Sequence, residues 1–384
     1  MYTDSMKKKI IRISTVPISL DIVLKGQLEM LSEEYEVIAV SSPGRELQRV
    51  AEREGVRTIA IPMERKISPL KDIISLIRLI KLFIDEKPHM VHSLTPKAGL
   101  LAMIAAWICR VPIRMHTFTG LVFPTAQGMK QKILIATDRI TCYCATFINP
   151  EGKGVKNDLQ RYHITSKPLN IIGNGNINGI DLDYFTAEND IKAKTEKIAK
   201  AGVMTYCFVG RIVGDKGINE LVAAFDDLNK EHPDTRLLLV GTLEESDPLS
   251  AEALQIINGN RAIECAGWQN DIRPYLAASD IFVLPSYREG FPNVVMQAGA
   301  MGLPSIVTDI NGSNEIIEDG INGIIVKPRN KEELKNAMER LLTSEELRNN
   351  LAKNARQRIA QRYEQKELWQ QLKATYQSLF NAIE

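Results

Sequence analysis

The segment VGRIVGDKG, Val209–Gly217, combines glycines with two cationic side chains, Arg211 and Lys216. A predicted strand leads into it, and a predicted helix begins near Ile218. Glycine lets the backbone approach a ligand closely, and a helix N-terminus with two nearby cations favours phosphate. The spacing of a Walker A loop is absent. The segment therefore predicts phosphate binding at a strand-to-helix turn, with an ordinary turn carrying solvated charges as the alternative.

A second candidate lies in REGFPNVVMQAGAMG, residues 288–302, where Glu289 and Gln297 stand eight positions apart. The apolar run DIFVLPS predicts a buried strand before this loop, and NVVMQAGAMG predicts a helix that Gly302 ends. We expect Glu289 at the carboxyl end of that strand, where its carboxylate can accept hydrogen bonds from the hydroxyl groups of a ligand. Gln297, two turns into the helix, can point along the same side.

The first half of the chain offers weaker candidates. We expect His116 in HTFTG just after an apolar strand, where it could reach a ligand; a satisfied core or loop histidine is the alternative. In SLTPKAGLL, Thr95-Pro96 opens a predicted helix with Lys97 in its first turn. A cation there is unfavourable unless an anion lies nearby, which hints at an anionic ligand, with a solvated lysine as the alternative.

The sequence predicts no metal site. Asp181-Leu182-Asp183 could hold a divalent ion beside a diphosphate, but its place in a linker favours a turn with a helix cap. RITCYCATFINP is expected to be a strand, which would put Cys142 and Cys144 on one face, without further ligands at zinc spacing. The five scattered cysteines predict no disulfide framework and fit a reducing compartment.

The composition is that of a globular chain long enough for two domains: of 384 residues, 44% are hydrophobic and 25% charged. Aromatic residues make up 6% and do not interleave with basic windows, so nucleic-acid binding has no support. We expect no signal peptide and no membrane-spanning run, which favours a cytoplasmic protein. The net charge of +1 hides an asymmetry, because residues 1–175 carry 25 basic and 16 acidic side chains and the remainder 23 and 31.

This asymmetry suggests that the basic half contacts an anionic surface, such as the inner face of the plasma membrane. The helix predicted for SPLKDIISLIRLIKLFIDEK, residues 68–87, mixes Ile and Leu with basic side chains and could lie on such a surface. A sheet-covering helix with a solvated rim is the alternative that we favour for this segment.

Strands alternate with helices along almost the whole chain, which predicts parallel sheets covered on both faces. The Gly- and Asn-rich stretch LNIIGNGNINGIDLDYF predicts a linker between domains. We therefore expect a Rossmann-like domain over 1–175, a second over 176–365, and a C-terminal helix over 366–384 that returns toward the first domain. Ligands bind beyond the carboxyl ends of such strands, so the site is expected in a cleft between the domains.

Taken together, these motifs resemble those of retaining glycosyltransferases of family four, the glycosyl transferases group 1. The resemblance is strongest over 209–327, in VGRIVGDKG, AGWQNDIRPYLAASDIFVLPSYREGFPN, GLPSIVTDINGSNEII and DGINGIIV. VHSLTPKAGLLA and HTFTG resemble the members that act on lipid-linked or nascent polysaccharide acceptors. The resemblance implies the GT-B fold, which is an α/β fold of two doubly wound, Rossmann-like domains facing a central cleft.

The resemblance also implies roles, residue by residue. Arg211 and Lys216 would neutralise the diphosphate of the donor, and Glu289 would contact the donor sugar. His116 would lie near the sugar and the reacting centre. The other implied donor-binding residues are Gly210, Gly290, Phe291, Pro292, Asn293 and Gln297. The implied acceptor-side residues are Thr95, Lys97 and Thr119.

Two features depart from the family pattern. Gln297 stands where the family has a second Glu that holds the nucleotide ribose; an amide can still bind hydroxyls, so the change affects affinity more than activity. The first loop, STVPISLDIV, lacks the Gly-Gly pair that many relatives place near the diphosphate. Residues 291–293 keep the loop whose backbone amides hold sugar hydroxyls in the family.

The implied activity is transfer of a sugar from a nucleotide diphosphate, expected to be a UDP-sugar, with retention. The implied acceptor is a glycan or a polyprenyl-diphosphate-linked saccharide in surface polysaccharide synthesis. No metal or other cofactor is expected, because Arg211 and Lys216 would supply fixed positive charge. The alternatives are a non-catalytic sugar-nucleotide-binding subunit and a GT-B sugar-nucleotide epimerase.

Overall fold

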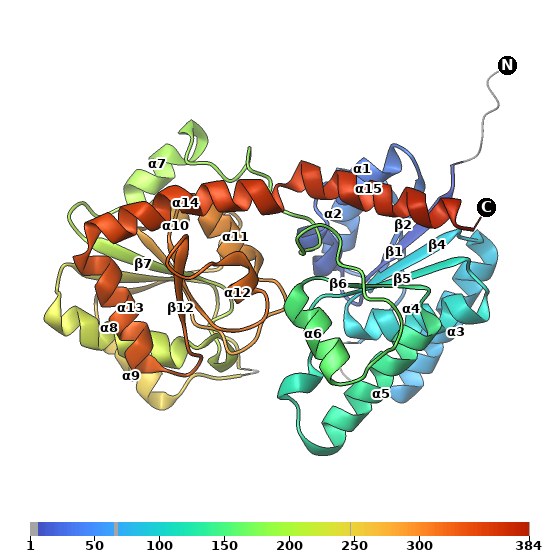
Figure 1. The fold of residues 1–384 in the computed structure, drawn as a ribbon, viewed down its shortest axis with the longest axis horizontal. Helices are drawn as coiled ribbons and strands as arrows, with labels where there is room; N and C mark the ends of the chain where they lie inside the picture. The colour runs from blue at the N-terminus through green and yellow to red at the C-terminus, as the bar shows by residue number, and fades with distance from the viewer. Residues whose placement is uncertain (1–6, 65–67, 246, 384) are drawn as a thin grey trace. The chain divides into compact units, whose positions relative to one another are not determined.

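The computed structural model describes residues 7–64, 68–245 and 247–383. Packing divides the chain into two compact units, residues 1–179 together with 366–384, and residues 180–365. The chain thus passes from the first unit to the second after residue 179, a few residues beyond the boundary expected at 175. Each unit contains one six-stranded parallel sheet with helices packed against it (Figure 1). The doubly wound α/β architecture expected from the sequence is confirmed.

The N-terminal sheet has the strand order β3-β2-β1-β4-β5-β6, and its neighbouring strands are parallel. Strand β1 is central because the chain adds β2 and β3 on one side before it crosses to β4 on the other. The bounds are β1 Lys9–Ile13, β2 Glu36–Ser41, β3 Arg57–Ala60, β4 Met90–Leu94, β5 Ile113–Phe118 and β6 Phe147–Pro150.

Alternation of side chains along these strands divides the core between the two faces of the sheet. In β1, Ile11 and Ile13 pack with α3, α4 and α5, whereas Ile10 packs with α1, α2 and α15. The bounds are η1 Ser19–Val23, α1 Gln27–Ser32, α2 Arg45–Glu54, α3 Pro69–Glu86, α4 Pro96–Ile108, η2 Phe123–Thr125, α5 Gly128–Cys144, α6 Lys153–Arg161 and α15 Gln365–Asn381.

The segment RITCYCATFINP is not one strand. Its first half forms the last turns of α5, and only its last four residues pair as β6. Cys142 and Cys144 are buried in the final turns of this helix, so the shared strand face expected for them is wrong. Between β1 and β2, Gly26 with a φ of 78° separates η1 from α1.

The C-terminal sheet has the order β12-β11-β10-β7-β8-β9, again with parallel neighbours. Strand β7 is central: the chain builds β8 and β9 on one side and then β10, β11 and β12 on the other. The bounds are β7 Met204–Val209, β8 Thr235–Val240, β9 Ile263–Gly267, β10 Ile281–Leu284, β11 Ser305–Thr308 and β12 Gly323–Val326.

The helices of this unit cover strands that are apolar on both faces, as buried parallel strands are. Their bounds are α7 Asn189–Ile198, η3 Gly214–Lys216, α8 Ile218–Glu231, α9 Ala251–Gly259, α10 Arg273–Ala277, α11 Asn293–Ala300, α12 Ser313–Ile316, α13 Lys331–Thr343 and α14 Glu345–Tyr363. Across the described ranges of both units, none of the helices has the length and apolarity that crossing a membrane requires.

Helix α15 closes a buried polar cluster of the N-terminal unit. Arg12, fully buried on β1, donates from Nη1 to Gln27 Oε1 (2.8 Å) and to the hydroxyl of Tyr376 on α15 (3.2 Å). The same hydroxyl lies 2.5 Å from Nδ1 of His92. Leu372, one turn earlier on α15, is buried in the adjoining apolar cluster. Because a buried cation is costly without hydrogen bonds, the unit depends on α15.

We expect Leu372→Ala to lower the free energy of unfolding by about 2–4 kcal/mol, because it removes buried methyl groups and leaves a cavity. Urea denaturation of the full-length chain measures this change. Ser378→Ala, at an exposed position of the same helix, is the matched control and should change the free energy by less than about 0.5 kcal/mol. Equal effects of the two substitutions would show that α15 does not pack into the unit.

Candidate functional site

The candidate site lies where the C-terminal sheet reverses its strand order. The chain leaves the central strand β7 toward β8 and later returns on the other side as β10, so the loops after β7 and β10 start at neighbouring carboxyl ends. In open parallel sheets, ligands bind at this switch point. The two segments that the sequence singles out for chemistry, 209–217 and 288–302, follow β7 and β10 respectively.

Backbone contacts hold these two loops together. Gly217, which precedes α8, has a φ of 70°, a conformation that favours glycine. A Cβ at this position would lie 2.0 Å from the carbonyl oxygen of Pro285, the residue that follows β10. The amide of Tyr287 also donates to the carbonyl of Asp215 (2.9 Å). The loop after β7 is therefore seated directly on the loop after β10.

Lys216 and Glu289 meet between these loops. Lys216 Nζ lies 2.5 Å from Glu289 Oε1, and the two side chains are only 19% and 14% exposed. Partial burial weakens screening by water, so each charge acts strongly on its surroundings. The pair places one cation and one carboxylate side by side at the switch point. A phosphate can bind the first of these groups, and hydroxyl groups can bind the second.

Arg211 lies in the same loop as Lys216 but makes a different contact. Its Nη1 lies 3.1 Å from Glu244 Oε2, in the loop after β8, and the two side chains are 48% and 37% exposed. Exposed ion pairs of this kind contribute little stability. Arg211 can therefore exchange Glu244 for a stronger anion at low cost, whereas Lys216 is held in place.

Several polar residues that the sequence analysis missed brace the two loops. The Asp215 amide donates to Asp247 Oδ2 (2.6 Å), and Arg288 Nη2 lies 3.2 Å from Asp215 Oδ2. The Tyr287 hydroxyl donates to Glu220 Oε2 (2.6 Å), and burial together with this carboxylate raises the pKa of Tyr287. The partners stand 32 to 73 positions apart in the chain, so no local pattern indicates them.

The segment GFPN, residues 290–293, joins Glu289 to α11. Phe291 is buried, and its ring meets that of Tyr363 with centroids 5.5 Å apart, so Phe291 anchors the loop in the core. Pro292 carries no amide hydrogen and cannot donate to a ligand, which corrects the amide role expected at that position. The other residues of the segment carry amide hydrogens.

Two more donor-side candidates lie at the ends of these loops. Gly210 follows β7 directly and has a φ of 153°. Gln297 lies in the second turn of α11 and is partly buried. Among the donor-side candidates, the structure thus joins Lys216 to Glu289 directly. Gly210 lies before Lys216 on the first segment, and Gln297 lies after Glu289 on the second.

In the N-terminal unit, His116 lies inside β5 and is only 1% exposed. Its Nδ1 lies 2.8 Å from the Ser93 hydroxyl on β4, and its ring packs edge-on against Phe118 with centroids 4.5 Å apart. Gly99 of α4 leaves room for the ring, since a Cβ there would lie 2.3 Å from His116 Cε1. The position expected for His116, just after the strand, is therefore wrong, and the core alternative describes it.

The acceptor-side candidates surround the start of α4. Thr95 has a φ of 68°, and its hydroxyl lies 2.8 Å from that of Thr15, which accepts from an amide in the first turn of α4. Lys97 donates to both carboxylate oxygens of Asp72 (2.7 and 2.9 Å). The cation at this helix start is therefore neutralised by the protein and gives no sign of an anionic ligand. Thr119 follows β5 and is partly buried.

The Asp181-Leu182-Asp183 segment forms the turn that the sequence favoured. Asp181 Oδ1 accepts hydrogen bonds from the amides of Asp183 and Tyr184, both at 3.0 Å. An aspartate that caps its own turn in this way has one carboxylate oxygen engaged with the backbone.

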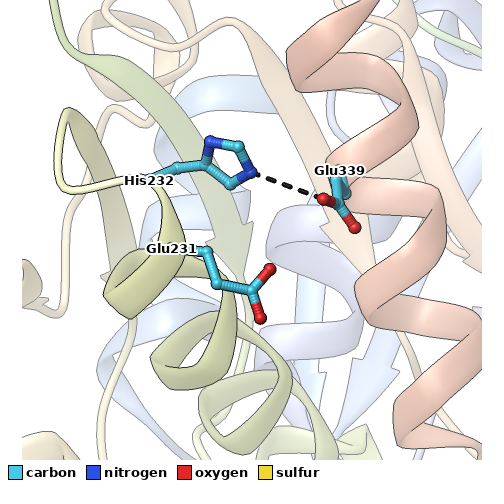
Figure 2. A group of neighbouring side chains, drawn as sticks. All are labelled: Glu231, His232 and Glu339. Carbon is cyan, nitrogen blue, oxygen red and sulfur yellow. Dashed lines mark hydrogen bonds and ion pairs between the residues drawn. The ribbon is translucent and has the colours of Figure 1, made fainter.

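A different cluster comes closest to the spacing of metal ligands among the described residues. It consists of Glu231, His232 and Glu339, with His232 Nε2 3.4 Å from Glu339 Oε1 (Figure 2). Lys335 Nζ lies 2.7 Å from Glu231 Oε1, so an ammonium already neutralises one of the three groups. The cluster lies where α8 ends and β8 is about to begin, at the sheet edge opposite the Lys216–Glu289 pair.

Comparison with known proteins adds the family. The family model described as glycosyl transferases group 1 matches residues 190–358, and the glycosyl transferase 4-like domain matches residues 25–175. The capsular polysaccharide biosynthesis glycosyltransferase CapM of Staphylococcus aureus is 31% identical over 380 residues, 98% of this chain and 99% of that protein. The UDP-Gal:alpha-D-GlcNAc-diphosphoundecaprenol alpha-1,3-galactosyltransferase of Escherichia coli is 30% identical over 80% of each chain.

Among solved structures, HepE from Anabaena in complex with UDP and glucose is similar in fold, with a TM-score of 0.82 at 18% identity. The similarity covers 97% of this chain and 100% of that chain. The GT-B fold and the transferase activity expected from the motifs are thereby confirmed. This chain belongs to the glycosyl transferases group 1 family and is a glycosyltransferase with the GT-B fold.

Proposed function

We propose that this glycosyltransferase moves a sugar from a UDP-sugar to a lipid-diphosphate-linked saccharide, with retention at the anomeric carbon and without a metal ion. The reaction would serve surface polysaccharide synthesis at the inner face of the plasma membrane. The observation that carries the proposal is the Lys216–Glu289 pair at the switch point. It offers a cation to a diphosphate and a carboxylate to sugar hydroxyls, which are the two halves of a nucleotide-sugar donor.

The names of two relatives support the substrate classes. The Escherichia coli relative is named for UDP-Gal as donor and for a diphosphoundecaprenol-linked sugar as acceptor. The Staphylococcus aureus relative is named for capsular polysaccharide biosynthesis. We extend the classes, a UDP-sugar and a lipid-diphosphate-linked saccharide, to this chain, and not the individual sugars.

In the proposed complex, Lys216 and Glu289 no longer pair with each other, because each contacts a different part of the donor. The diphosphate would lie beside Lys216, and Arg211 would turn from Glu244 toward it, so that two cations face two phosphates. Glu289 would then accept hydrogen bonds from the hydroxyls of the sugar. Charge-assisted hydrogen bonds of this kind are stronger than neutral ones, and they orient the anomeric carbon relative to the loops. Gln297 would contact the ribose with its amide.

In the transfer step, the bond between the anomeric carbon and the diphosphate oxygen breaks. A bond from the acceptor hydroxyl oxygen forms on the same face of the sugar, which retains the configuration. The acceptor proton passes to an oxygen of the departing phosphate. Lys216 and Arg211 stabilise the negative charge that grows on this leaving group, which is the role that a divalent ion would otherwise fill.

His116 cannot serve as an acid in this step near neutral pH. Burial lowers its pKa to about 3, and the hydrogen bond with Ser93 opposes this only in part. The imidazole is therefore neutral under the conditions in which sugar nucleotides react. In this proposal His116 acts only as a neutral imidazole. It is hydrogen-bonded to Ser93 and packed against Gly99.

We expect UDP to bind the full-length chain in the presence of a chelator with a dissociation constant on the order of micromolar, because Arg211 and Lys216 supply the charge. Isothermal titration calorimetry with UDP and GDP measures this. Lys216→Ala should weaken UDP binding at least about ten-fold. Lys335→Ala removes a similar ion pair at the opposite edge of the sheet and should leave binding unchanged. Binding that requires Mn²⁺ would contradict the metal-independent proposal.

We expect Arg211→Ala and Glu289→Gln each to lower sugar transfer at saturating donor by about 10²–10³-fold, because each removes a charge that acts on the reacting donor. The assay uses an undecaprenyl-diphosphate-linked N-acetylglucosamine acceptor and UDP-sugars, with products identified by mass spectrometry and the anomer by NMR. Glu231→Gln is the matched carboxylate control.

Three outcomes of this assay would count against the proposal. Near-normal transfer by Arg211→Ala would remove the role of this residue in catalysis. An inverted anomer would refute retention. An epimerised sugar nucleotide without transfer would favour the epimerase alternative.

We expect the NMR signal of His116 Cε1 to stay constant between about pH 5 and 8, because its pKa lies near 3 and its ordinary value is 6.5. N-acetylhistidine in the same sample provides the titrating reference. Between these two pKa values the unfolded chain binds a proton that the folded chain does not. This site therefore lowers stability as the pH falls below about 6.5. A midpoint near pH 6.5 for His116 would show that its ring is open to solvent.

A further inference from the structure

Three neighbouring helices of the N-terminal unit expose an apolar surface. Among the described residues, 18 large hydrophobic side chains are strongly exposed, and 11 of them lie on α3, α4 and α5. We call these 11 side chains the outer face. Exposed apolar side chains gathered on neighbouring helices often mark an interaction site.

On α3, the exposed apolar side chains form a single stripe on the side that points away from the sheet. Leu79 and Phe83 are buried on the opposite side and account for the packing of the helix on the sheet. The stripe consists of Leu70 (79% exposed), Ile73, Ile74, Ile77 (60%) and Ile84. The helix covers the sheet, as expected, and in addition exposes an apolar stripe on its opposite side.

Helix α5 repeats the pattern on the same side of the sheet. Its exposed apolar side chains are Met129 (70% exposed), Ile133, Ile140 and Tyr143 (69%). Helix α4 packs between α3 and α5, as Figure 1 shows. Its exposed Trp107 lies with its ring 6.3 Å from that of Tyr143 and, with Ile108, completes the outer face.

The charged side chains that border the outer face are mostly positive. On α3 and α5 the exposed basic residues are Arg78, Lys81, Lys130, Lys132, Arg139 and Lys71, of which Lys71 is paired with Glu64, and the exposed acidic residue is Asp85. The other carboxylates of these helices do not offset this charge. Asp72 is paired with Lys97, Glu86 with Lys9 and Arg57, and Asp138 is buried, which raises its pKa to about 7.

We propose that the outer face docks on the surface of a membrane that contains anionic lipid. Apolar side chains with an adjacent basic border are the two features that hold a helix in the plane of a lipid interface, because the first enter the acyl boundary while the second meet the headgroups. The occupant is a lipid surface and not a second copy of this chain, since a two-fold dimer through this face would bring its basic border close to itself.

The geometry of the unit determines which edge of its sheet would lie near the docked membrane. Helices that connect parallel strands begin at the carboxyl ends of the strands, so α3, α4 and α5 start at the edge that carries Thr95 and Thr119. The outer face thus runs from this edge to the opposite one. Docking would hold the edge close to the headgroups, where a lipid-linked saccharide is presented. This last step rests on the proposed function, whereas docking itself does not.

Vesicle flotation of the full-length chain at low salt tests the proposal. Vesicles of equimolar phosphatidylglycerol and phosphatidylcholine should carry the protein, and pure phosphatidylcholine vesicles should carry much less. Ile74→Ser with Ile77→Ser should reduce the floated fraction, with an apparent affinity at least about ten-fold lower. Lys130→Glu with Lys132→Glu should have the same effect and should also make flotation less sensitive to salt.

The matched control is Leu254→Ser with Ile321→Ser, which replaces two exposed apolar side chains of the C-terminal unit and should float as the parent does. Calorimetric UDP binding, measured in parallel, should be the same for all variants, so loss of docking is distinguished from loss of the donor site. No flotation of the parent, equal flotation with uncharged vesicles, or a dimer that Ile74→Ser with Ile77→Ser dissociates would each overturn the proposal.

Discussion

The close contact between Gly217 and the Pro285 carbonyl is the constraint on which the candidate site depends. A main-chain oxygen cannot rotate away as a side chain can, so any Cβ at 217 would push the two loops apart. Lys216, the residue before this glycine, would then lose Glu289. Strands β7 and β10, which lead into the two loops, are hydrogen-bonded neighbours. The sheet therefore determines how far apart the cation and the carboxylate lie. Asp247 and Arg288 then restrain the loop that carries Lys216.

The two units use polar side chains in opposite ways. The C-terminal unit brings charges to a sheet edge and keeps them available, as Arg211 shows by its weak pairing. The N-terminal unit buries Arg12, His92 and His116 among hydroxyl and amide groups and keeps the imidazoles neutral. The first arrangement suits an anionic ligand that arrives and leaves. The second suits a scaffold whose buried histidines stay neutral near pH 7.

Much of the architecture could be predicted from the sequence because strand and helix periods alternate so regularly. The glycine loop before Ile218 and the GFPN turn were also readable, since local residues determine both. The sequence failed where local pattern and tertiary context disagree. Cys142 and Cys144 alternate like strand residues but lie on a helix, and His116 follows enough apolar residues to suggest a strand end while β5 continues to Phe118. Contacts such as Asp215 with Asp247 depend on loops meeting in space, which no local pattern encodes.

The return of the chain through α15 has a consequence for biosynthesis. The N-terminal unit is interrupted in sequence by residues 180–365, so the ribosome completes the second unit before it makes the helix that finishes the first. Domains usually mature in the order in which they are translated. Here the order is reversed: until Leu372 and Tyr376 emerge, the groove for α15 is open and Arg12 lacks one of its hydrogen-bond partners. The first unit can therefore complete its packing only after α15 has been synthesised.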